Sequence, residues 1–327
     1  MSALLKRRSA PVLRARQRGI ALLVAILLVA MGTIIAAALA YENAMMARRG
    51  AATFALDESV LIGEAAEALA AWGLKQVWQS DKQHIYIGQG WDKPQGPFEV
   101  VPGVMLTAQL EDLSGRFNLN SLVNSDGTPN LVAIAAFQQL LVSLQIEPKW
   151  ADLIVDWIDP DSTPTVPDGA EDSVYMGQLP PYYVPNMYIT SASELLALPG
   201  FGRDRYKKIA PFVVALPIDA KVNICTASGL VLDAYIPGRR EFGLDPDGLQ
   251  KNRENANGCF PTQAEYQQAF ESPQQYTAAS KFFALNSAYF RLTSFVTIGS
   301  TEFNVYSLMY MDATGSVRPL IRSYTPD

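Results

Sequence analysis

One uncharged hydrophobic stretch near the amino terminus constrains this chain more than any other feature. Between Arg18 and Glu42 no side chain is ionised at neutral pH. An α-helix rises about 1.5 Å per residue, so residues 20–41 would span about 33 Å, which is enough to cross the hydrocarbon core of a bilayer. We therefore predict a transmembrane helix over residues 20–41.

The charges before this helix predict its orientation. Six basic residues and no acidic residue precede it. Positively charged flanks are retained in the cytoplasm, so the rest of the chain is expected on the other side of the membrane. The protein is therefore predicted to cross the membrane once, with its folded part outside the cytoplasm.

Three interpretations of the hydrophobic stretch remain open. A removable secretory signal would be cut near residues 38–40, but its apolar region would be far longer than the roughly 7 to 15 residues expected. A plain signal anchor fits the hydropathy. The third interpretation is a basic leader that ends in Gly19 and is followed at once by the apolar Ile20. This pattern resembles the type IV prepilin class, which implies cleavage after Gly19 by prepilin peptidase and methylation of Ile20.

Val24 departs from the prepilin pattern in an informative way. Members of the class that this chain resembles, the pilins and most pseudopilins, carry Glu at the fifth residue after the cleavage site. This chain has Val24 at that position. An unpaired carboxylate in an apolar environment costs a few kcal/mol, so a subunit with none ahead of it loses nothing by dropping that Glu. With the features below, the chain resembles the minor pseudopilin K family of type II secretion systems, also called general secretion pathway protein K.

This resemblance implies a fold, a location and a set of partners. The expected fold class is α+β, in which a pilin-like long amino-terminal helix packs on an antiparallel sheet and a large α-helical domain is inserted. The expected function is to cap the tip of the secretion pseudopilus and to initiate or limit its assembly. The implied partners are the minor pseudopilins I and J, with H and the major pseudopilin G below them, at the periplasmic side of the inner membrane.

Hydrophobic periodicity divides the rest of the chain. We predict a cleaved leader at 1–19, the membrane helix at 20–41, and an amphipathic continuation of that helix at 42–80. A first part of the pilin-like domain follows at 81–125, an inserted helical domain at 126–216, and the remainder of the pilin-like domain at 217–327.

The continuation at 42–80 shows a helical pattern of apolar residues. These recur at intervals of about three and four residues, so we predict one buried stripe with the acidic residues elsewhere around the helix. The stripe consists of Ala47, Phe54, Val60, Leu61, Ala65, Leu69, Trp72 and Val77.

Alternating residues predict the sheet. Apolar side chains from Val104 to Leu110 alternate with more polar ones, as expected for a strand with one buried face. Residues 289–298, 302–311 and 317–324 predict three further strands with short joins, hence an antiparallel meander. The intervening motif at 111–121 reads EDLSGRFNLNS and resembles a landmark of the same family; we expect its Asn side chains to bond nearby backbone.

The inserted segment shows two apolar stripes at helical spacing, within residues 131–144 and 150–158, and a hairpin motif. Residues 191–209 resemble a helix-hairpin-helix of SAM-like domains, with Gly200 and Gly202 in the connection. Such hairpins can bind DNA phosphates through backbone amides and basic side chains such as Arg205. After residue 217 we expect a polar stretch in which residues 246–258 form a loop.

The segment at 156–190 is strongly acidic. No Lys or Arg occurs between Trp150 and Gly202, so the carboxylates there lack basic partners and would be best held by a cation. Oxygen ligands without His or Cys favour calcium, although a solvated acidic loop is an equal alternative on charge alone. We predict that a chelator loosens residues 159–186.

Residues 156–161 (DWIDPD), 169–172 (GAED) and 185–186 (PN) resemble the calcium-binding region of the protein K family. The resemblance implies one or two structural Ca²⁺ ions. The implied ligands are Asp159, Asp161, Glu171, Asp172 and Asn186, with Asp156 and Asp168 as further candidates.

The remaining composition narrows the function classes. Cys225 and Cys259 form an even pair beyond the membrane helix, which predicts a disulfide rather than a metal site. The net charge of −6 would fall to −12 once the leader's six positive charges are removed, which disfavours nucleic-acid binding. A single His and the lack of common hydrolase motifs argue against an enzyme. A membrane-anchored DNA-binding protein and an anchored periplasmic calcium-dependent enzyme remain the alternatives.

Overall fold

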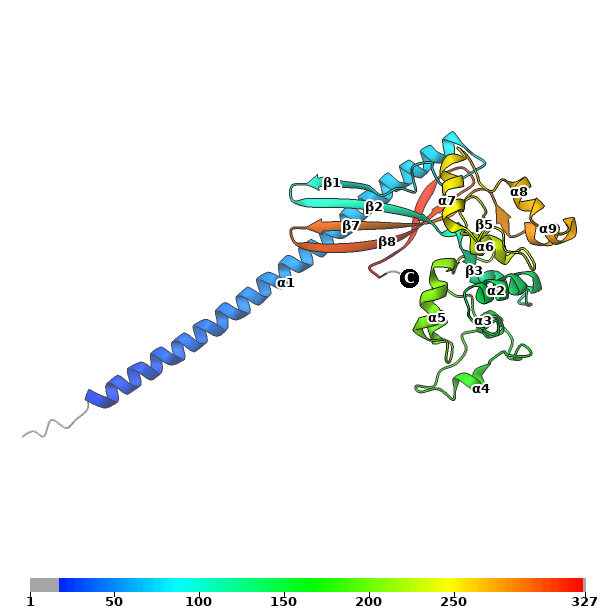
Figure 1. Ribbon diagram of the computed structural model, residues 1–327. Helices are drawn as coiled ribbons and strands as arrows, with labels where there is room; N and C mark the ends of the chain where they lie inside the picture. Colours follow the sequence, from blue (N-terminus) through cyan, green and yellow to red (C-terminus); the bar gives the residue numbers. More distant parts are fainter. Residues whose placement is uncertain (1–17, 326–327) are drawn as a thin grey trace, which may run out of the picture. The chain divides into compact units, whose positions relative to one another are not determined.

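The computed structural model describes residues 18–325. These divide into two compact units, of which the first ends at Glu58 and the second begins at Ser59. The first described unit is helical throughout and belongs to α1 (Arg18–Ser80, Figure 1). Its mean hydropathy reaches 2.9 over its most apolar part, and its length and composition suffice to cross a membrane. Residues 1–17 of the predicted leader at 1–19 lie outside the described residues.

The second unit contains a five-stranded sheet in the order β1-β2-β7-β8-β9, with every neighbouring pair antiparallel (Figure 1). The predicted meander is confirmed, and the structure adds an edge strand before it. The strands are β1 (Gln95–Val101), β2 (Val104–Asp112), β7 (Tyr289–Ile298), β8 (Thr301–Met311) and β9 (Val317–Ser323).

The central pairing joins strands that are far apart in sequence. β2 and β7 pair without interruption from Val104 opposite Ile298 to Asp112 opposite Phe290. Every helix after α1 therefore lies, along the chain, between these two neighbouring strands. The α+β class predicted from the sequence is confirmed.

The end of α1 packs on one face of the sheet, but with a different side from the one predicted. Ile62, Ala66 and Leu74 are buried in one core with the sheet, whereas Leu69 and Trp72 are 61% and 65% exposed. The predicted stripe was wrong for most of its residues, because both sides of this helix carry apolar residues, although Val77 packs against this core as predicted. The sheet is covered by the side with the small residues, which allow the helix to approach closely.

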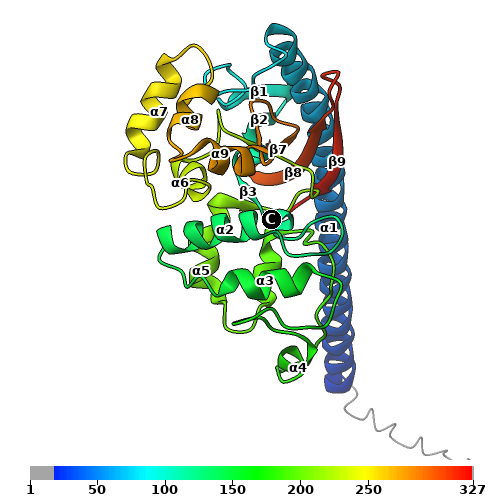
Figure 2. The same ribbon diagram turned by 90° about the vertical axis from the view of Figure 1, so that its right-hand side faces the viewer.

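Helices and short strands form the segment between β2 and β7, and most of them share one hydrophobic core. Figure 2 shows α2, α3 and α5 grouped together, with α7, α8 and α9 in a second group. The helices are α2 (Leu131–Ser143), α3 (Trp150–Ile158), α4 (Asp172–Tyr175), α5 (Gly202–Ile209), α6 (Gly229–Ala234), α7 (Pro246–Asn255), α8 (Gln263–Gln268) and α9 (Pro273–Ser280). Two parallel two-residue pairs join β3 (Phe117–Asn118) to β4 (Val213–Val214) and β5 (Val222–Asn223) to β6 (Phe283–Ala284).

Four 3-10 helices complete the described elements of this segment. They span Leu113–Gly115, Leu119–Leu122, Ala192–Ala197 and Ala210–Phe212. The first stripe predicted for the insert corresponds to α2 and the second to α3, so both helical patterns are confirmed.

The loop predicted at 246–258 was wrong, because α7 occupies most of it. Asp245 caps this helix by accepting a hydrogen bond from the amide of Gly248. The helix is held by Arg253, whose buried guanidinium donates to four backbone carbonyls, those of Ile224, Thr226, Ala227 and Phe260. Such long-range anchoring leaves no local pattern in the sequence.

The Asn residues of the motif at 111–121 bond distant backbone as well as nearby backbone. Asn118 accepts from the amide of Asn120, as expected, but its side-chain amide donates to the carbonyl of Pro217. The Asn120 side chain donates to the carbonyls of Ile189 and Leu216 and accepts from the amide of Ile189. The expected local bond is therefore confirmed for Asn118, and the longer-range bonds of both side chains hold three segments of the chain together.

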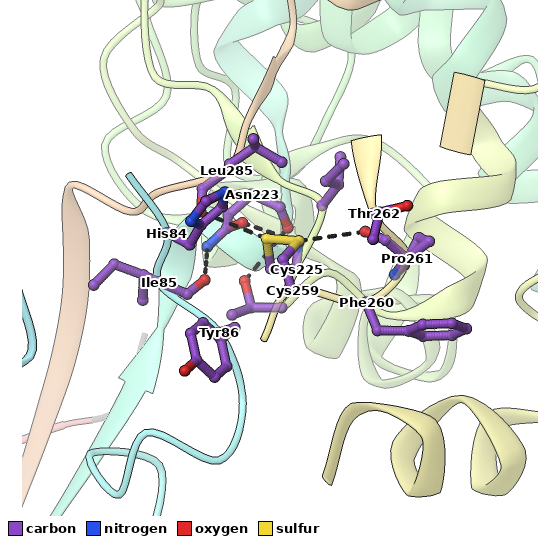
Figure 3. The surroundings of a disulfide bond; sticks show 12 residues. His84, Ile85, Tyr86, Asn223, Cys225, Cys259, Phe260, Pro261, Thr262 and Leu285 are labelled. Carbon is purple, nitrogen blue, oxygen red and sulfur yellow. Dashed lines mark hydrogen bonds between the residues drawn. A yellow bond between two sulfur atoms is a disulfide. The ribbon is translucent and has the colours of Figure 1, made fainter. Parts of the chain in front are cut away.

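Cys225 and Cys259 form the predicted disulfide (Figure 3). Asn223 lies beside it and accepts a hydrogen bond from the amide of Cys225 at 3.0 Å. The Asn223 side chain also donates to the carbonyl of Ile85 at 2.8 Å, as drawn in Figure 3. The disulfide therefore belongs to a buried junction between the start of the second unit and its helical segment.

Candidate functional site

The acidic segment brings three carboxylates together. Asp156 lies in the last turn of α3, Asp159 is the residue that ends this helix, and Glu171 precedes α4. One carboxylate oxygen of each lies within 4.8 Å of the others. The three residues are 0%, 2% and 5% exposed, respectively. Buried carboxylates this close repel one another unless a positive charge joins them.

Unpaired oxygen atoms support a cation at this position. Asp159 Oδ1 and Glu171 Oε1 are buried and accept no hydrogen bond from the residues that the structure describes. Within the same described part of the chain, the side-chain oxygen of Asn186 is also buried without a partner. Native structures leave few such atoms unsatisfied, so each needs an explanation. Two carboxylate oxygens and one amide oxygen are the type of ligand that calcium prefers, so the residues fit this ion.

The electrostatics of the cluster agree with this interpretation. Burial, followed by the charges of Asp161 and Asp156, raises the pKa of Asp159 to about 7. The pKa of Glu171 is also raised to about 7, by burial first and then by the charges of the neighbouring carboxylates Asp156, Asp159, Asp161 and Asp172. A divalent cation among these oxygens would reverse the effect by favouring the ionised forms.

Asp156 connects the cluster to the following loop. Its carboxylate accepts the backbone amide of Thr165 at 3.0 Å, and burial raises its pKa although these hydrogen bonds lower it. The loop approaches so closely at Gly169 that an added Cβ atom would lie 2.2 Å from Asp156 Oδ2. Glycine is therefore needed at position 169 for the loop to close over the carboxylate.

Asn186 is held in an orientation that leaves its oxygen available. Its backbone φ of 47° lies in the left-handed region, which Asn tolerates better than most residues. Its side-chain nitrogen donates to the carbonyl of Asp161 at 2.9 Å. The amide nitrogen is thus used by the loop, and the oxygen remains for another partner.

The other predicted ligands lie on exposed parts of the loop. Asp161 accepts the amide of Thr163 at 2.7 Å, and Asp172 accepts the amide of Val184 at 3.1 Å. The charges of Asp161 and Asp172 still contribute to the raised pKa of Glu171. Asp168 is exposed, and its backbone amide hydrogen-bonds Asp152.

One acidic residue near the cluster was missed in the ligand prediction. Asp152 is 6% exposed, and the charges of Asp168 and Asp156 raise its pKa after the larger effect of burial. The signal was present in the sequence, because Asp152 precedes Asp156 by four residues on α3 and residues at this spacing share a helix face.

Aromatic side chains join the acidic segment to the hairpin motif. The rings of Trp157 and Tyr175 lie 5.5 Å apart, and that of Tyr182 lies 5.5 Å from Tyr175. The indole nitrogen of Trp157 donates to Glu194 at 3.2 Å. The Tyr182 hydroxyl donates to the carbonyl of Ala197 at 2.5 Å.

The hairpin uses a basic residue for an internal contact. Gly200 and Gly202 adopt positive φ values of 81° and 75° in the tight connection. Arg205 donates to both carboxylate oxygens of Glu147, at 2.9 and 2.7 Å, and its guanidinium lies 5.3 Å from the centre of the Trp150 ring. This ion pair disfavours the DNA-binding alternative, because Arg205 already has an anionic partner.

The predicted processing residues lie at the start of α1. Gly19, Ile20 and Val24 are all helical, and the side chain of Val24 is 50% exposed. Cleavage after Gly19 and methylation of Ile20 remain predictions.

Comparison with known proteins gives consistent matches. A family model described as type II secretion system (T2SS), protein K, matches residues 115–218. Type II secretion system protein K of Pseudomonas aeruginosa is 31% identical, over 95% of this chain and 93% of that protein. The protein of the same name from Aeromonas hydrophila is 35% identical, over 70% of this chain and 73% of that protein.

A solved structure supports the fold. The crystal structure of the GspK-GspI-GspJ complex from the type 2 secretion system of enterotoxigenic Escherichia coli contains a chain that matches with a TM-score of 0.71. The match covers 84% of this chain and 98% of that chain, at 22% sequence identity. At this level of identity the likeness shows the fold.

Proposed function

Because this chain belongs to the type II secretion system protein K family, we propose that it is the minor pseudopilin that caps the tip of the secretion pseudopilus. In this role it initiates or limits assembly of the fibre that exports folded periplasmic proteins. The observation that carries the proposal is the similarity to protein K of Pseudomonas aeruginosa, which extends over 95% of this chain.

The proposed partners are other pseudopilins. The solved protein with the same fold was crystallised as a GspK-GspI-GspJ complex. We propose that this chain binds the minor pseudopilins I and J in the same way, with H and the major pseudopilin G below them. Val24 supports a terminal position, because a subunit with none ahead of it needs no carboxylate there.

Processing by prepilin peptidase and anchoring in the inner membrane belong to the same proposal. The basic leader, Gly19 and the uncharged helix after it support cleavage between Gly19 and Ile20. The hydrophobic part of α1 would remain in the inner membrane until the subunit joins the fibre, and residues after Glu42 would lie in the periplasm.

We propose that the acidic cluster holds Ca²⁺ in a structural role. Asp156, Asp159, Glu171 and Asn186 would contribute side-chain oxygens, and the bound ion would supply the positive charge that the segment lacks. Asp161 and Asp172 are the further candidates, because their charges reach Glu171. The segment from 159 to 186 has little regular structure apart from α4, so the ion would replace a hydrophobic core in ordering it.

Neither alternative function has comparable support. The curated relatives are named as secretion-system proteins rather than enzymes. DNA binding through the hairpin would require Arg205 to exchange the carboxylate of Glu147 for a phosphate.

Electron microscopy of pseudopili tests the proposed position. The full-length chain carrying an epitope tag at its carboxyl terminus would be produced with the complete secretion system, and immunogold particles would be located on the fibres. We expect particles at one end of each fibre, and amino-terminal sequencing of the purified chain is expected to begin at Ile20. Particles distributed along the fibres, or a chain that still begins at Met1, would contradict the proposal.

A further inference from the structure

Tyr175 presents a buried hydroxyl group that the described structure leaves without a partner. The residue is 0% exposed and lies at the end of α4. Its hydroxyl oxygen is buried and makes no hydrogen bond among the described residues. A phenol carries one donor and also accepts, and buried tyrosines usually find a partner for this group.

The Tyr175 ring packs against α3 beside the acidic cluster, because it lies 5.5 Å from the ring of Trp157, the residue that follows Asp156. Glu171 precedes Tyr175 by four residues and borders the same short helix. The charges of Asp156 and Glu171 both raise the pKa of the Tyr175 hydroxyl, after the larger effect of burial. The rings of Trp157 and Tyr182 each lie 5.5 Å from the Tyr175 ring, centre to centre. The Tyr175 side chain therefore has little freedom to rotate.

The unpaired atoms in this region complement one another. Asp159 Oδ1, Glu171 Oε1 and Asn186 Oδ1 only accept, and a cation satisfies them directly. The phenolic hydrogen of Tyr175 cannot be satisfied by a cation, and no carboxylate of residues 18–325 accepts a hydrogen bond from it. A water molecule can accept this hydrogen while its own oxygen binds the ion, and calcium sites commonly include water in their shell of six to eight oxygens.

We propose that Tyr175 is a positioning residue of the metal centre, which donates a hydrogen bond to a water molecule in the coordination shell of the bound Ca²⁺. This inference rests on the proposed calcium site. It assigns the hydroxyl a role in metal affinity that is separate from the packing of the ring. Residues that orient ligands from outside the coordination shell typically change metal affinity by about 10- to 100-fold when they are removed.

The test compares two tyrosine variants of the full-length chain. Tyr175→Phe keeps the ring and removes the unpaired hydroxyl. Tyr182→Phe is the control, because Tyr182 packs against Tyr175 and its hydroxyl donates to the carbonyl of Ala197. Calcium affinity would be measured by isothermal titration calorimetry. We expect Tyr175→Phe to weaken binding about 10- to 100-fold, and Tyr182→Phe to leave it close to that of the unchanged chain.

Thermal unfolding separates this role from a general effect on packing. In EDTA, Tyr175→Phe is expected to melt at or above the temperature of the unchanged chain, because it removes a buried group without a partner. In calcium, Tyr175→Phe is expected to melt at a lower temperature than the unchanged chain. An equal loss of melting temperature in both conditions, or an unchanged calcium affinity, would overturn the proposal.

Terbium luminescence distinguishes a bridging water from direct coordination. Tb³⁺ replaces Ca²⁺ in many oxygen sites, and Trp157, the residue after Asp156, would serve as its sensitiser. Lifetimes in H₂O and D₂O give the number of water molecules bound to the ion. We expect this number to be unchanged in Tyr175→Phe. A rise would mean that the hydroxyl itself had been a ligand and would overturn the proposal. If the unchanged chain binds neither ion, the calcium site itself fails, which is a different result.

Discussion

The guanidinium of Arg322 on β9 donates two hydrogen bonds to the buried carboxylate of Glu67 on α1. Its Nε lies 2.6 Å from Oε1 and its Nη2 lies 2.8 Å from Oε2. Glu67 is only 3% exposed and also accepts the hydroxyl of Ser307 at 2.6 Å. This ion pair therefore links α1 to β9, the last strand of the sheet, through a carboxylate that is buried beneath the surface.

Removing the Arg322 side chain should leave the buried Glu67 carboxylate without its ionic partner. Loss of one partner of a buried pair costs about 3 to 5 kcal/mol, and the partial exposure of Arg322 reduces the expected loss for Arg322→Ala to about 1 to 3 kcal/mol. The free energy of unfolding would be measured by urea denaturation of the detergent-purified chain. Arg318→Ala on the same strand is the control, because Arg318 is exposed and its guanidinium lies 5.8 Å from the centre of the Tyr310 ring. Equal losses for the two variants would show that the pair contributes nothing specific.

The β8–β9 turn offers a test of close packing. Gly315 adopts a φ of 76°, and a Cβ atom added there would lie 2.4 Å from the Trp78 ring on α1. Gly299 in the β7–β8 turn also has a positive φ, of 61°, but has nothing within 4 Å. We expect Gly315→Ala to cost about 2 to 4 kcal/mol because it displaces Trp78, and Gly299→Ala to cost about 1 kcal/mol from backbone strain alone. Urea denaturation would measure both, and similar values would contradict the packing argument.

The disulfide should contribute strongly to the stability of the helical segment. Cys225 and Cys259 are separated by 34 positions. A closed loop of this length constrains the unfolded chain by about 3 to 4 kcal/mol. We therefore expect the double variant Cys225→Ser, Cys259→Ser to lose that amount in urea denaturation. Dithiothreitol should destabilise the unchanged chain and leave the double variant unaffected; sensitivity of both would point to another cause.

Calcium should protect the acidic segment from proteolysis. EDTA is expected to accelerate cleavage within residues 159–186, because the ion would be the main element that orders them. Asp159→Asn should be cleaved rapidly even in calcium, since it weakens a buried ligand. Asp247→Asn, an exposed change on α7, should behave like the unchanged chain. Mass spectrometry of the fragments would locate the cuts, and cleavage that ignores EDTA would count against the site.

The stability of the metal-free protein should fall as the pH rises. Asp159 and Glu171 have pKa values of about 7 in the folded state, against ordinary values of 3.8 and 4.5. The folded state therefore binds more protons than the unfolded state between these values, and stability decreases as pH increases through this window. Melting temperatures in EDTA are expected to drop from about pH 5 to about pH 7. Calcium should remove or reverse this drop, because it binds the ionised carboxylates.

A variant provides the control for this pH effect. Asp159→Asn combined with Glu171→Gln removes both titrating groups, so its melting temperature in EDTA should depend less on pH. An identical pH profile for this variant and the unchanged chain would assign the effect to other residues.

The sheet could be predicted from the sequence because its signal is local. Alternation of apolar and polar residues on β2 and β7 specifies which side is buried, and short Gly-containing joins specify antiparallel neighbours. The buried side of α1 could not be predicted in the same way. Leu69 and Trp72 are larger and more apolar than Gly63 and Glu67, yet the latter two face the sheet. Their burial depends on Val305 and Arg322, which lie more than 200 residues further along the chain.

The acidic cluster was predictable in part. The lack of Lys and Arg across the segment showed that its carboxylates had no basic partner, and the structure brings Asp156, Asp159 and Glu171 together. The division between buried and exposed carboxylates was not predictable. It depends on where the loop turns, which is set by backbone hydrogen bonds such as that from Thr165 to Asp156.

The pairing of β2 with β7 has a consequence for biogenesis. Their facing residues are separated by at least 178 positions, the distance along the chain from Asp112 to Phe290. At roughly 5 to 20 residues per second, translation would deliver β7 some 9 to 36 seconds after β2. During that interval β2 has an open edge, which invites pairing with other chains. We therefore expect the helical segment to fold before the sheet closes, because all of it is synthesised before β7.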